Sequence, residues 1–393
     1  MRILFIPNVG AVVPHLVPLI ALNRQLDLGK HQTAFLVPRI YHTALKSMGL
    51  SVLDIDYRQE HAFRNEMAAC WNFRPDVMVD DFSMTALFTA KLAKKPRITI
   101  LRTGAFPGAS PRDATHRHSS ESANGSRIDF SGTASSHAAL AGLRAPKNFA
   151  EACAADIGII PGIRSIEVLP EAARENPSFF FAGSLSIPDA DIPMPGIDHA
   201  GAVASISTFM GRHEGTPAAF ATLGSVLKTN EATHQAIRYM LDCGMAVVST
   251  MDVPDLSASS RERFLYLPFV PMHEICARVD LMIHHCGSGT YQYAITHKVP
   301  AICIGSGCYD RDDVAHRLEQ LGVAKYIPHT LNVDAFAEKF RETFDECMSA
   351  GSSWHAMATK RLQLLKDEVD QTTARFDFES LLKRAAASCL VPA

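Results

Sequence analysis

A short stretch in the second half of the chain combines histidines with small residues in an order suited to phosphate binding. An apolar segment ends in His284 and His285, and a turn and a helical pattern follow it. The small residues of this turn are Gly287, Ser288, Gly289 and Thr290. Glycines let a backbone approach its ligand closely, and the amides of a helix N-terminus attract anions. Thr290 would add a hydroxyl, and His285 a hydrogen-bond donor or a cation. The alternative is an ordinary strand-to-helix turn with a buried histidine pair.

A second turn of the same kind follows the first apolar segment of the second half. Residues 221–226 read Ala-Thr-Leu-Gly-Ser-Val, so this turn would present its amides and the Ser225 hydroxyl. A Gly-Ser pair after a strand most often forms an ordinary turn that binds no ligand. Two such turns at strand ends, one of them with two histidines, favour a phosphate site.

The first half holds a histidine and two acids that could cooperate in proton transfer. His15 follows an apolar segment and a loop that contains Gly10, and Asp80 and Asp81 end a later apolar segment. A histidine that acts as a base benefits from a carboxylate that fixes its tautomer. The alternative is that His15 caps the following helix and that both acids cap theirs.

The remaining acidic residues do not suggest a metal site. Two Asp-x-Asp pairs, Asp54 with Asp56 and Asp189 with Asp191, have no supporting acids nearby and are interpreted as solvated. Residues 310–322 predict an amphipathic helix with an acidic N-terminus. We therefore expect no metal and no other cofactor.

Apolar runs alternate with helical patterns, which is typical of parallel sheets covered by helices on both faces. In the first half we expect strands at residues 2–7, 33–37, 52–55, 76–79, 97–101, 157–160 and 179–182. In the second half we expect strands at 218–223, 245–250, 264–267, 281–284 and 301–304, and helices at 231–243, 288–296, 312–321, 333–348 and 354–367. The sequence thus predicts an α/β protein with two doubly wound domains facing one another across a cleft. Ligands of such sheets bind beyond the carboxyl ends of the strands.

A segment rich in Pro, Gly and Asp separates the two halves. We expect an N-terminal domain over residues 1–190, a linker over 191–216 and a C-terminal domain over 217–370. A final helix over 371–393 is expected to pack back on the first domain.

The composition excludes several classes of protein. The chain has 393 residues, of which 47% are hydrophobic and 20% charged, with a net charge of −3. It is therefore neither disordered nor basic enough to suggest a nucleic acid or an anionic membrane as a partner. Its nine cysteines are scattered without a Cys-x-x-Cys, which indicates the reduced thiols of a cytoplasmic protein. The apolar N-terminal segment contains three prolines and favours a strand, a loop and a helix over a signal peptide or membrane span.

The order of these motifs resembles that of the GT-B nucleotide-sugar glycosyltransferases that modify natural products. The likeness extends over most of the chain and is densest from Phe264 to Gly322. There Val270-Pro271, the His-His-x-Gly-x-Gly-Thr turn and Val299-Pro300 follow in the family's order. The segment from Gly10 to Pro18 is similar to the family's glycine-rich loop and His-x-x-Pro element.

The resemblance implies a donor site in the second half. The groups expected to bind the nucleoside diphosphate are Ser225, Val270, His285, Gly287, Ser288, Gly289 and Thr290. Asp310 occupies the position of an acid that binds the donor sugar. Arg311 stands where the family has Gln, so it would either contact an acidic sugar or turn toward Asp312 or Asp313. Cys286 stands where a second glycine of the turn is usual.

The resemblance also implies an acceptor site in the first half. His15 is expected to be the general base, oriented by Asp81 rather than Asp80. The residues expected to line the acceptor pocket are Val12, Val13, Phe106 and Phe130.

The predicted function is inverting, metal-independent transfer of a hexose from a dTDP- or UDP-sugar to a small, largely apolar natural product, at a hydroxyl or amine. A homodimer is compatible with this prediction. The alternatives are a nucleotide-sugar epimerase or hydrolase on the same architecture, or a non-catalytic partner protein that kept the fold.

Overall fold

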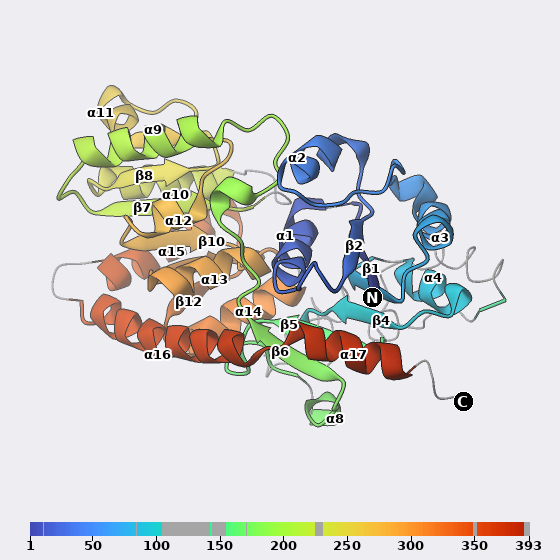
Figure 1. The fold of residues 1–393 in the computed structure, drawn as a ribbon. Helices are drawn as coiled ribbons and strands as arrows, with labels where there is room; N and C mark the ends of the chain where they lie inside the picture. Colours follow the sequence, from blue (N-terminus) through green and yellow to red (C-terminus); the bar gives the residue numbers. More distant parts are fainter. Residues whose placement is uncertain are drawn as a thin grey trace. The chain divides into compact units, whose positions relative to one another are not determined.

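The chain divides into two compact units (Figure 1). This computed structural model describes residues 1–10, 12–83, 85–103, 142–143, 155–169, 171–224, 231–307, 309–348 and 352–388. The first unit contains Met1–Gly196 and Val369–Ala393, and the second contains Ile197–Glu368. In the described residues, each unit has one six-stranded sheet whose neighbouring strands are all parallel. The predicted α/β class with two parallel sheets is confirmed.

The sheet of the first unit has the strand order β2-β1-β3-β4-β5-β6. Its strands are β1 (Arg2–Pro7), β2 (Gln32–Phe35), β3 (Val77–Asp81), β4 (Arg97–Ile100), β5 (Ile157–Pro161) and β6 (Phe179–Gly183). The described helices of this unit are α1 (Val12–Asn23), α2 (His42–Ser47), α3 (Ala62–Phe73), α4 (Ala86–Ala93), α8 (Glu171–Arg174) and α17 (Phe378–Ser388). Short 3-10 turns occur at η1 (Arg39–Tyr41), η2 (Gln59–His61) and η4 (Asp189–Asp191).

Both faces of the first sheet are buried, which explains its nearly continuous apolar strands. Successive residues of a strand point to opposite faces. Ile3 and Phe5 accordingly join a core with α1 and α17, whereas Leu4 and Ile6 join a second core with α3. The C-terminal helix α17, red in Figure 1, thus lies against strands from the start of the chain, where Phe378 approaches Phe5 with ring centroids 6.5 Å apart.

The sheet of the second unit has the strand order β12-β11-β10-β7-β8-β9. Its strands are β7 (Ala218–Thr222), β8 (Ala246–Ser249), β9 (Phe264–Tyr266), β10 (Leu281–His284), β11 (Ala301–Ile304) and β12 (Ala324–Ile327). Its described helices are α9 (His199–Arg212), α10 (Glu231–Asp242), α11 (Ala258–Glu262), α12 (Met272–Cys276), α13 (Ser288–His297), α14 (Tyr309–Gln320) and α15 (Val333–Met348). The long helix α16 (Trp354–Arg375) begins in this unit, and its residues from Val369 onward belong to the first unit. The apolar sides of α10 and α15 pack together in the core of the second unit.

The structure differs from the predicted elements at a few places. Residues 52–55 do not form a strand, because only Val52 makes a bridge, to Phe35, before two aspartates interrupt the apolar run. The edge strand β12 was not predicted, since Lys325 breaks its short apolar pattern. The segment expected to be a linker contains α9, whose N-terminus is capped by Asp198 accepting from the Gly201 amide at 2.9 Å.

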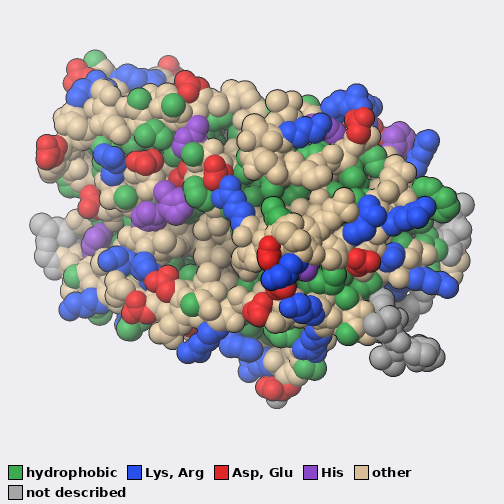
Figure 2. Space-filling view, in the orientation of Figure 1, with side chains coloured by type: hydrophobic (Ala, Val, Ile, Leu, Met, Phe, Trp, Pro, Cys, Tyr) green, Lys and Arg blue, Asp and Glu red, His purple; other side chains and the backbone are tan. Residues whose placement is uncertain are grey.

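Charged side chains of both signs occur on the surface. On the face shown in Figure 2, acidic and basic side chains are interspersed, in keeping with the net charge of −3. Within the described ranges, the helices include none that is both long and apolar enough to cross a membrane. The cysteines that the structure describes as free thiols are Cys70, Cys243, Cys276, Cys286, Cys303 and Cys347.

Candidate functional site

His15 and Asp81 form a hydrogen-bonded pair at the carboxyl edge of the first sheet. Asp81 ends β3 beside Pro7, the last residue of β1, and His15 lies in the first turn of α1. His15 Nδ1 is 2.9 Å from Asp81 Oδ1, with the histidine side chain 17% exposed and the carboxylate fully buried. Since a carboxylate only accepts, Nδ1 carries the proton and Nε2 of the neutral ring is left with a free lone pair. This is the arrangement that a general base requires.

Asp80, the preceding residue, has a different environment because it points to the other face of the strand. Its two oxygens accept from Arg97 Nε at 2.7 Å and Nη2 at 3.0 Å. It also accepts from the Thr99 hydroxyl at 3.1 Å and from the Ser83 amide at 3.1 Å. The structure therefore brings Asp81, not Asp80, to His15, and uses Asp80 to join β3 to β4.

Arg102 belongs to the same cluster, although the sequence did not single it out. It lies two residues beyond Ile100, the β4 residue paired with Asp81. Its Nη2 donates to Asp81 Oδ2 at 3.0 Å, so the buried carboxylate is shared between His15 and an arginine. The sequence signal for this residue was a single arginine at the end of an apolar strand segment.

A buried carboxylate holds the segment that follows Asp81. Glu66 on α3 is fully buried and accepts hydrogen bonds of 2.6–2.7 Å from four hydroxyls. The donors are Tyr57, Ser83, Thr85 and Thr89. Burial raises the pKa of the Glu66 carboxyl, while the hydroxyls oppose that shift. Because Ser83 and Thr85 lie on either side of the strand-to-helix connection after β3, this cluster fixes the backbone beside Asp81.

The predicted phosphate turn joins β10 to α13. Cys286 has a left-handed φ of 56°, which explains why glycine is the usual residue at this position of the resembling family. The ring nitrogen Nδ1 of His284 accepts from the Cys286 amide at 3.0 Å and stabilises this bend. Gly287 is the N-cap of α13 and provides no capping side chain. The first amides of α13 are therefore available to an anion.

His285 is packed between the two glycine turns and is only 4% exposed. A Cβ added at Gly224 would lie 2.6 Å from His285 Cε1, and one added at Gly287 would lie 3.1 Å from Nε2. Gly224, with φ +66°, follows β7, and β7 pairs with β10. The two predicted turns therefore meet around this imidazole.

His285 is uncharged at neutral pH in this structure. Burial lowers the pKa of its ring to about 3, and the positive charge of Arg311 contributes in the same direction. Nδ1 of the ring is buried without a hydrogen-bond partner in the described part of the chain. His285 therefore contributes no positive charge at neutral pH.

The other predicted site residues divide into three groups. Ser225, Phe106 and Phe130 lie outside the described residues, as does the side chain of Asp310, whose backbone is in the first turn of α14. Val270 is buried just before α12, and Ser288, Gly289 and Thr290 form the first turn of α13. Val12 is buried in the core of the first unit, whereas Val13 is half-buried.

One group of potential metal ligands lies beneath the phosphate turn. Among the residues that the structure describes, His284, Cys286 and Cys303 have ligand atoms within 4.8 Å of one another. The Nδ1 lone pair of His284 is already bonded to the Cys286 amide, so Nε2 of the neutral ring carries the proton. Burial lowers the pKa of His284 to about 4 and raises that of the Cys286 thiol. In this structure the His284 ring thus stabilises the bend at Cys286.

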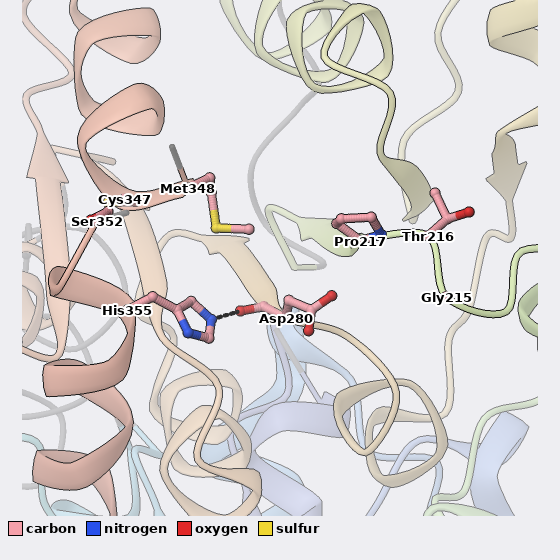
Figure 3. Close-up of a pocket in the computed structure, with 8 residues that line it drawn as sticks. All are labelled: Gly215, Thr216, Pro217, Asp280, Cys347, Met348, Ser352 and His355. Atoms are coloured by element: carbon pink, nitrogen blue, oxygen red, sulfur yellow. Dashed lines mark hydrogen bonds between the residues drawn. The ribbon is translucent and has the colours of Figure 1, made fainter. Parts of the chain in front are cut away.

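A separate pocket in the second unit lies away from these residues (Figure 3). It has a volume of about 480 Å³ and is lined by Gly215, Thr216, Pro217, Asp280, Cys347, Met348, Ser352 and His355. Pro217 and Asp280 directly precede β7 and β10, so the pocket lies at the amino ends of these strands, where open α/β sheets do not usually bind ligands. His355 Nε2 donates to the Asp280 carbonyl at 2.8 Å, and burial raises the pKa of the Cys347 thiol to about 12. The pocket contains none of the predicted site residues.

Comparisons with known proteins find sugar transferases. The chain is 26% identical over 102 residues to aclacinomycin-T 2-deoxy-L-fucose transferase of Streptomyces galilaeus, which is 26% of this chain and 23% of that protein. It is 27% identical over 141 residues to aklavinone 7-beta-L-rhodosaminyltransferase of the same organism, which is 33% of this chain and 31% of that protein. The aligned segments thus span less than a third of the length of these relatives. No protein-family model matches the chain.

Solved structures match the fold over nearly the whole chain. A Medicago truncatula glycosyltransferase complexed with UDP-glucose has a TM-score of 0.69 at 13% identity and covers 98% of each chain. Glycosyltransferase VinC, in complex with dTDP, has a TM-score of 0.65 at 16% identity and covers 99% of this chain and 100% of its own. The chain therefore has the GT-B fold, as predicted. The sequence relatives confirm the predicted resemblance to glycosyltransferases of natural-product pathways, and the solved structures confirm the fold.

Proposed function

We propose that the protein is a glycosyltransferase that moves a hexose from a dTDP- or UDP-sugar to a small, largely apolar acceptor. The observation that carries this proposal is the pairing of His15 with buried Asp81 in a GT-B fold, which leaves His15 Nε2 free to take a proton. The sequence relatives support sugar transfer in antibiotic pathways, and structural neighbours that bind dTDP and UDP-glucose support the donor class.

The first unit supplies the acceptor side of the proposed reaction. Nε2 of His15 takes the proton of an acceptor hydroxyl or amine while the acceptor atom attacks the anomeric carbon. Asp81 holds the ring through Nδ1 and stabilises the imidazolium that forms. Arg102 and the Glu66 cluster keep the Asp81 carboxylate in place. Direct attack in one displacement inverts the anomeric configuration.

The second unit supplies the donor side. The bond from the anomeric carbon to the diphosphate oxygen breaks, and its electron pair leaves with the diphosphate. The first amides of α13, with Thr290, donate to the charge that develops there. Asp310 is assigned to the donor sugar, and His285 forms a wall of the diphosphate site. Since fixed donors face the leaving group, we propose that the reaction proceeds without a metal.

A donor panel tests this function. The protein is incubated with dTDP- and UDP-hexoses, with and without small apolar alcohols and amines, and both the released nucleoside diphosphate and the mass of the acceptor are measured. A glycosyltransferase gives diphosphate release that depends on an acceptor, and an acceptor heavier by one sugar residue. Release that is independent of every acceptor would indicate a hydrolase, and isomerised donor an epimerase. Absence of both release and isomerisation would favour a non-catalytic protein.

A further inference from the structure

Arg311 has a buried guanidinium nitrogen without a partner. It is the third residue of α14, and its Nη1 makes no hydrogen bond in the described part of the chain although it is inaccessible to solvent. A buried charge is unfavourable unless it is paired and hydrogen-bonded. The Arg311 side chain as a whole is half-buried, and it is its Nη1 that has no hydrogen-bond partner among the described residues.

Asp312, the acid that follows Arg311, is engaged by other groups. Asp312 accepts from the amides of Ser306 at 2.8 Å and Gly307 at 3.0 Å, and lies 3.6 Å from His329. In the described ranges no ion pair joins Arg311 to Asp312 or to Asp313. The possibility that Arg311 only turns toward the acids of its own helix is therefore not what the structure shows. Asp312 instead holds the loop that follows β11.

α13 and α14 begin just beyond the carboxyl ends of the neighbouring parallel strands β10 and β11, so the start of α14 lies at the same edge of the sheet as the predicted phosphate turn. In keeping with this placement, the charge of Arg311 contributes to lowering the pKa of His285. His285 is 4% exposed and its Nδ1 is also without a partner among the described residues. Because its ring is neutral, His285 does not supply the positive charge that favours diphosphate binding. Arg311 has a permanent charge and N–H donors in a fork that matches phosphate oxygens.

We propose that Arg311 binds the diphosphate of the nucleotide sugar, as the permanent cation beside the N-terminus of α13. The proposal rests on the proposed function and makes it more specific. It assigns Arg311 to the leaving group rather than to the sugar. The contact is consequently expected with any nucleoside diphosphate, whether or not a sugar is attached, and whether or not that sugar is acidic.

Calorimetry with dTDP and UDP tests the assignment, because neither nucleotide carries the hexose that would be transferred. Loss of a hydrogen bond to a charged group should weaken binding by roughly 10- to 100-fold in Arg311→Met. Arg311→Lys should retain part of the affinity. Arg317→Met, the same substitution on the exposed side of α14, should bind like the wild type. Unchanged dTDP and UDP affinity in Arg311→Met would overturn the proposal, as would a loss confined to donors with an acidic sugar.

Thermal unfolding without ligand separates ligand binding from a structural role. Because Arg311 Nη1 has no partner to lose, Arg311→Met should unfold at the wild-type temperature or above it. Its stabilisation by dTDP or UDP should be smaller than that of the wild type. A clearly lower unfolding temperature without ligand would overturn the proposal, since it would show that Arg311 supports the fold. If the wild type bound neither dTDP nor UDP, the proposed function itself would fail.

Discussion

Removing the charge of each of the two adjacent aspartates of β3 should have different effects: Asp80→Asn should mainly lower stability, and Asp81→Asn should mainly lower the transfer rate. Asp80→Asn breaks a fully buried, two-bond pair with Arg97, and loss of one partner of such a pair costs about 3–5 kcal/mol. At about 2–4 °C per kcal/mol for a domain of this size, the first unit should unfold some 6–20 °C earlier. Asp81 accepts one bond from Arg102 at 3.0 Å and one from His15 at 2.9 Å. Because an asparagine keeps one accepting oxygen, Asp81→Asn should lose only one of these bonds, at a smaller cost of about 1.5–3 kcal/mol.

For the transfer rate, the larger loss is expected in Asp81→Asn rather than in Asp80→Asn. Asp81→Asn weakens the acceptor that holds His15 Nδ1, so transfer should fall on the order of a hundredfold or more. Asp80→Asn leaves the contact between His15 and Asp81 in place, so transfer per folded molecule should remain within a few-fold of wild type. The assay combines thermal unfolding by circular dichroism with transfer rates at a temperature where both variants are folded. Near wild-type transfer by Asp81→Asn, or an equal loss in folded Asp80→Asn, would refute the reasoning.

Three further predictions concern the second unit. Gly224→Ala should weaken dTDP binding roughly tenfold in calorimetry, because its Cβ would lie 2.6 Å from His285 Cε1 at a φ of +66°; wild-type affinity would contradict the packing around His285. Because the folded-state pKa values of His284 and His285, about 4 and about 3, lie below the unfolded value of 6.5, only the unfolded chain binds these protons as the pH falls below about 6.5. Urea unfolding should therefore show stability lost from about pH 6.5 toward pH 3, with a shallower slope in His285→Gln, and equal slopes would contradict the buried neutral ring. Transfer should survive EDTA, because backbone amides and Arg311 face the diphosphate; loss in EDTA that magnesium or manganese restores would contradict metal independence.

The strands that were predicted best are those buried on both faces. β10 and β11 are continuous apolar runs, and their observed bounds are the predicted ones. The apolar sequence pattern predicted strands least well at the edges of the sheets. β12 has an exposed-side lysine at Lys325, and residues 52–55 carry enough apolar character for a strand but make only one bridge. At an edge, pairing depends on which neighbour is available, and the local sequence does not contain that information.

Part of the candidate site could also be predicted from the sequence, because some of its residues directly follow buried strands. His15, Asp81 and His285 follow strand segments, and the carboxyl ends of parallel strands meet at one edge. The partners of these residues depend on packing between distant segments. Arg102 contacts Asp81 from the end of the neighbouring strand, and the charge of Arg311, at the start of α14, contributes to lowering the pKa of His285. The charge state of His285 follows from its burial between Gly224 and Gly287, which the two separate turns did not indicate.

The most direct measurement of the central claim compares transfer with nucleotide binding in His15→Ala, using the donor and acceptor that the panel identifies. Because the proposed mechanism assigns the acceptor proton to Nε2 of His15, transfer should fall on the order of a hundred- to ten-thousand-fold. The affinity for dTDP or UDP, measured by calorimetry on the same preparation, should stay near that of the wild type. Near wild-type transfer by His15→Ala would contradict the assignment of the base, and with it the proposed mechanism of sugar transfer.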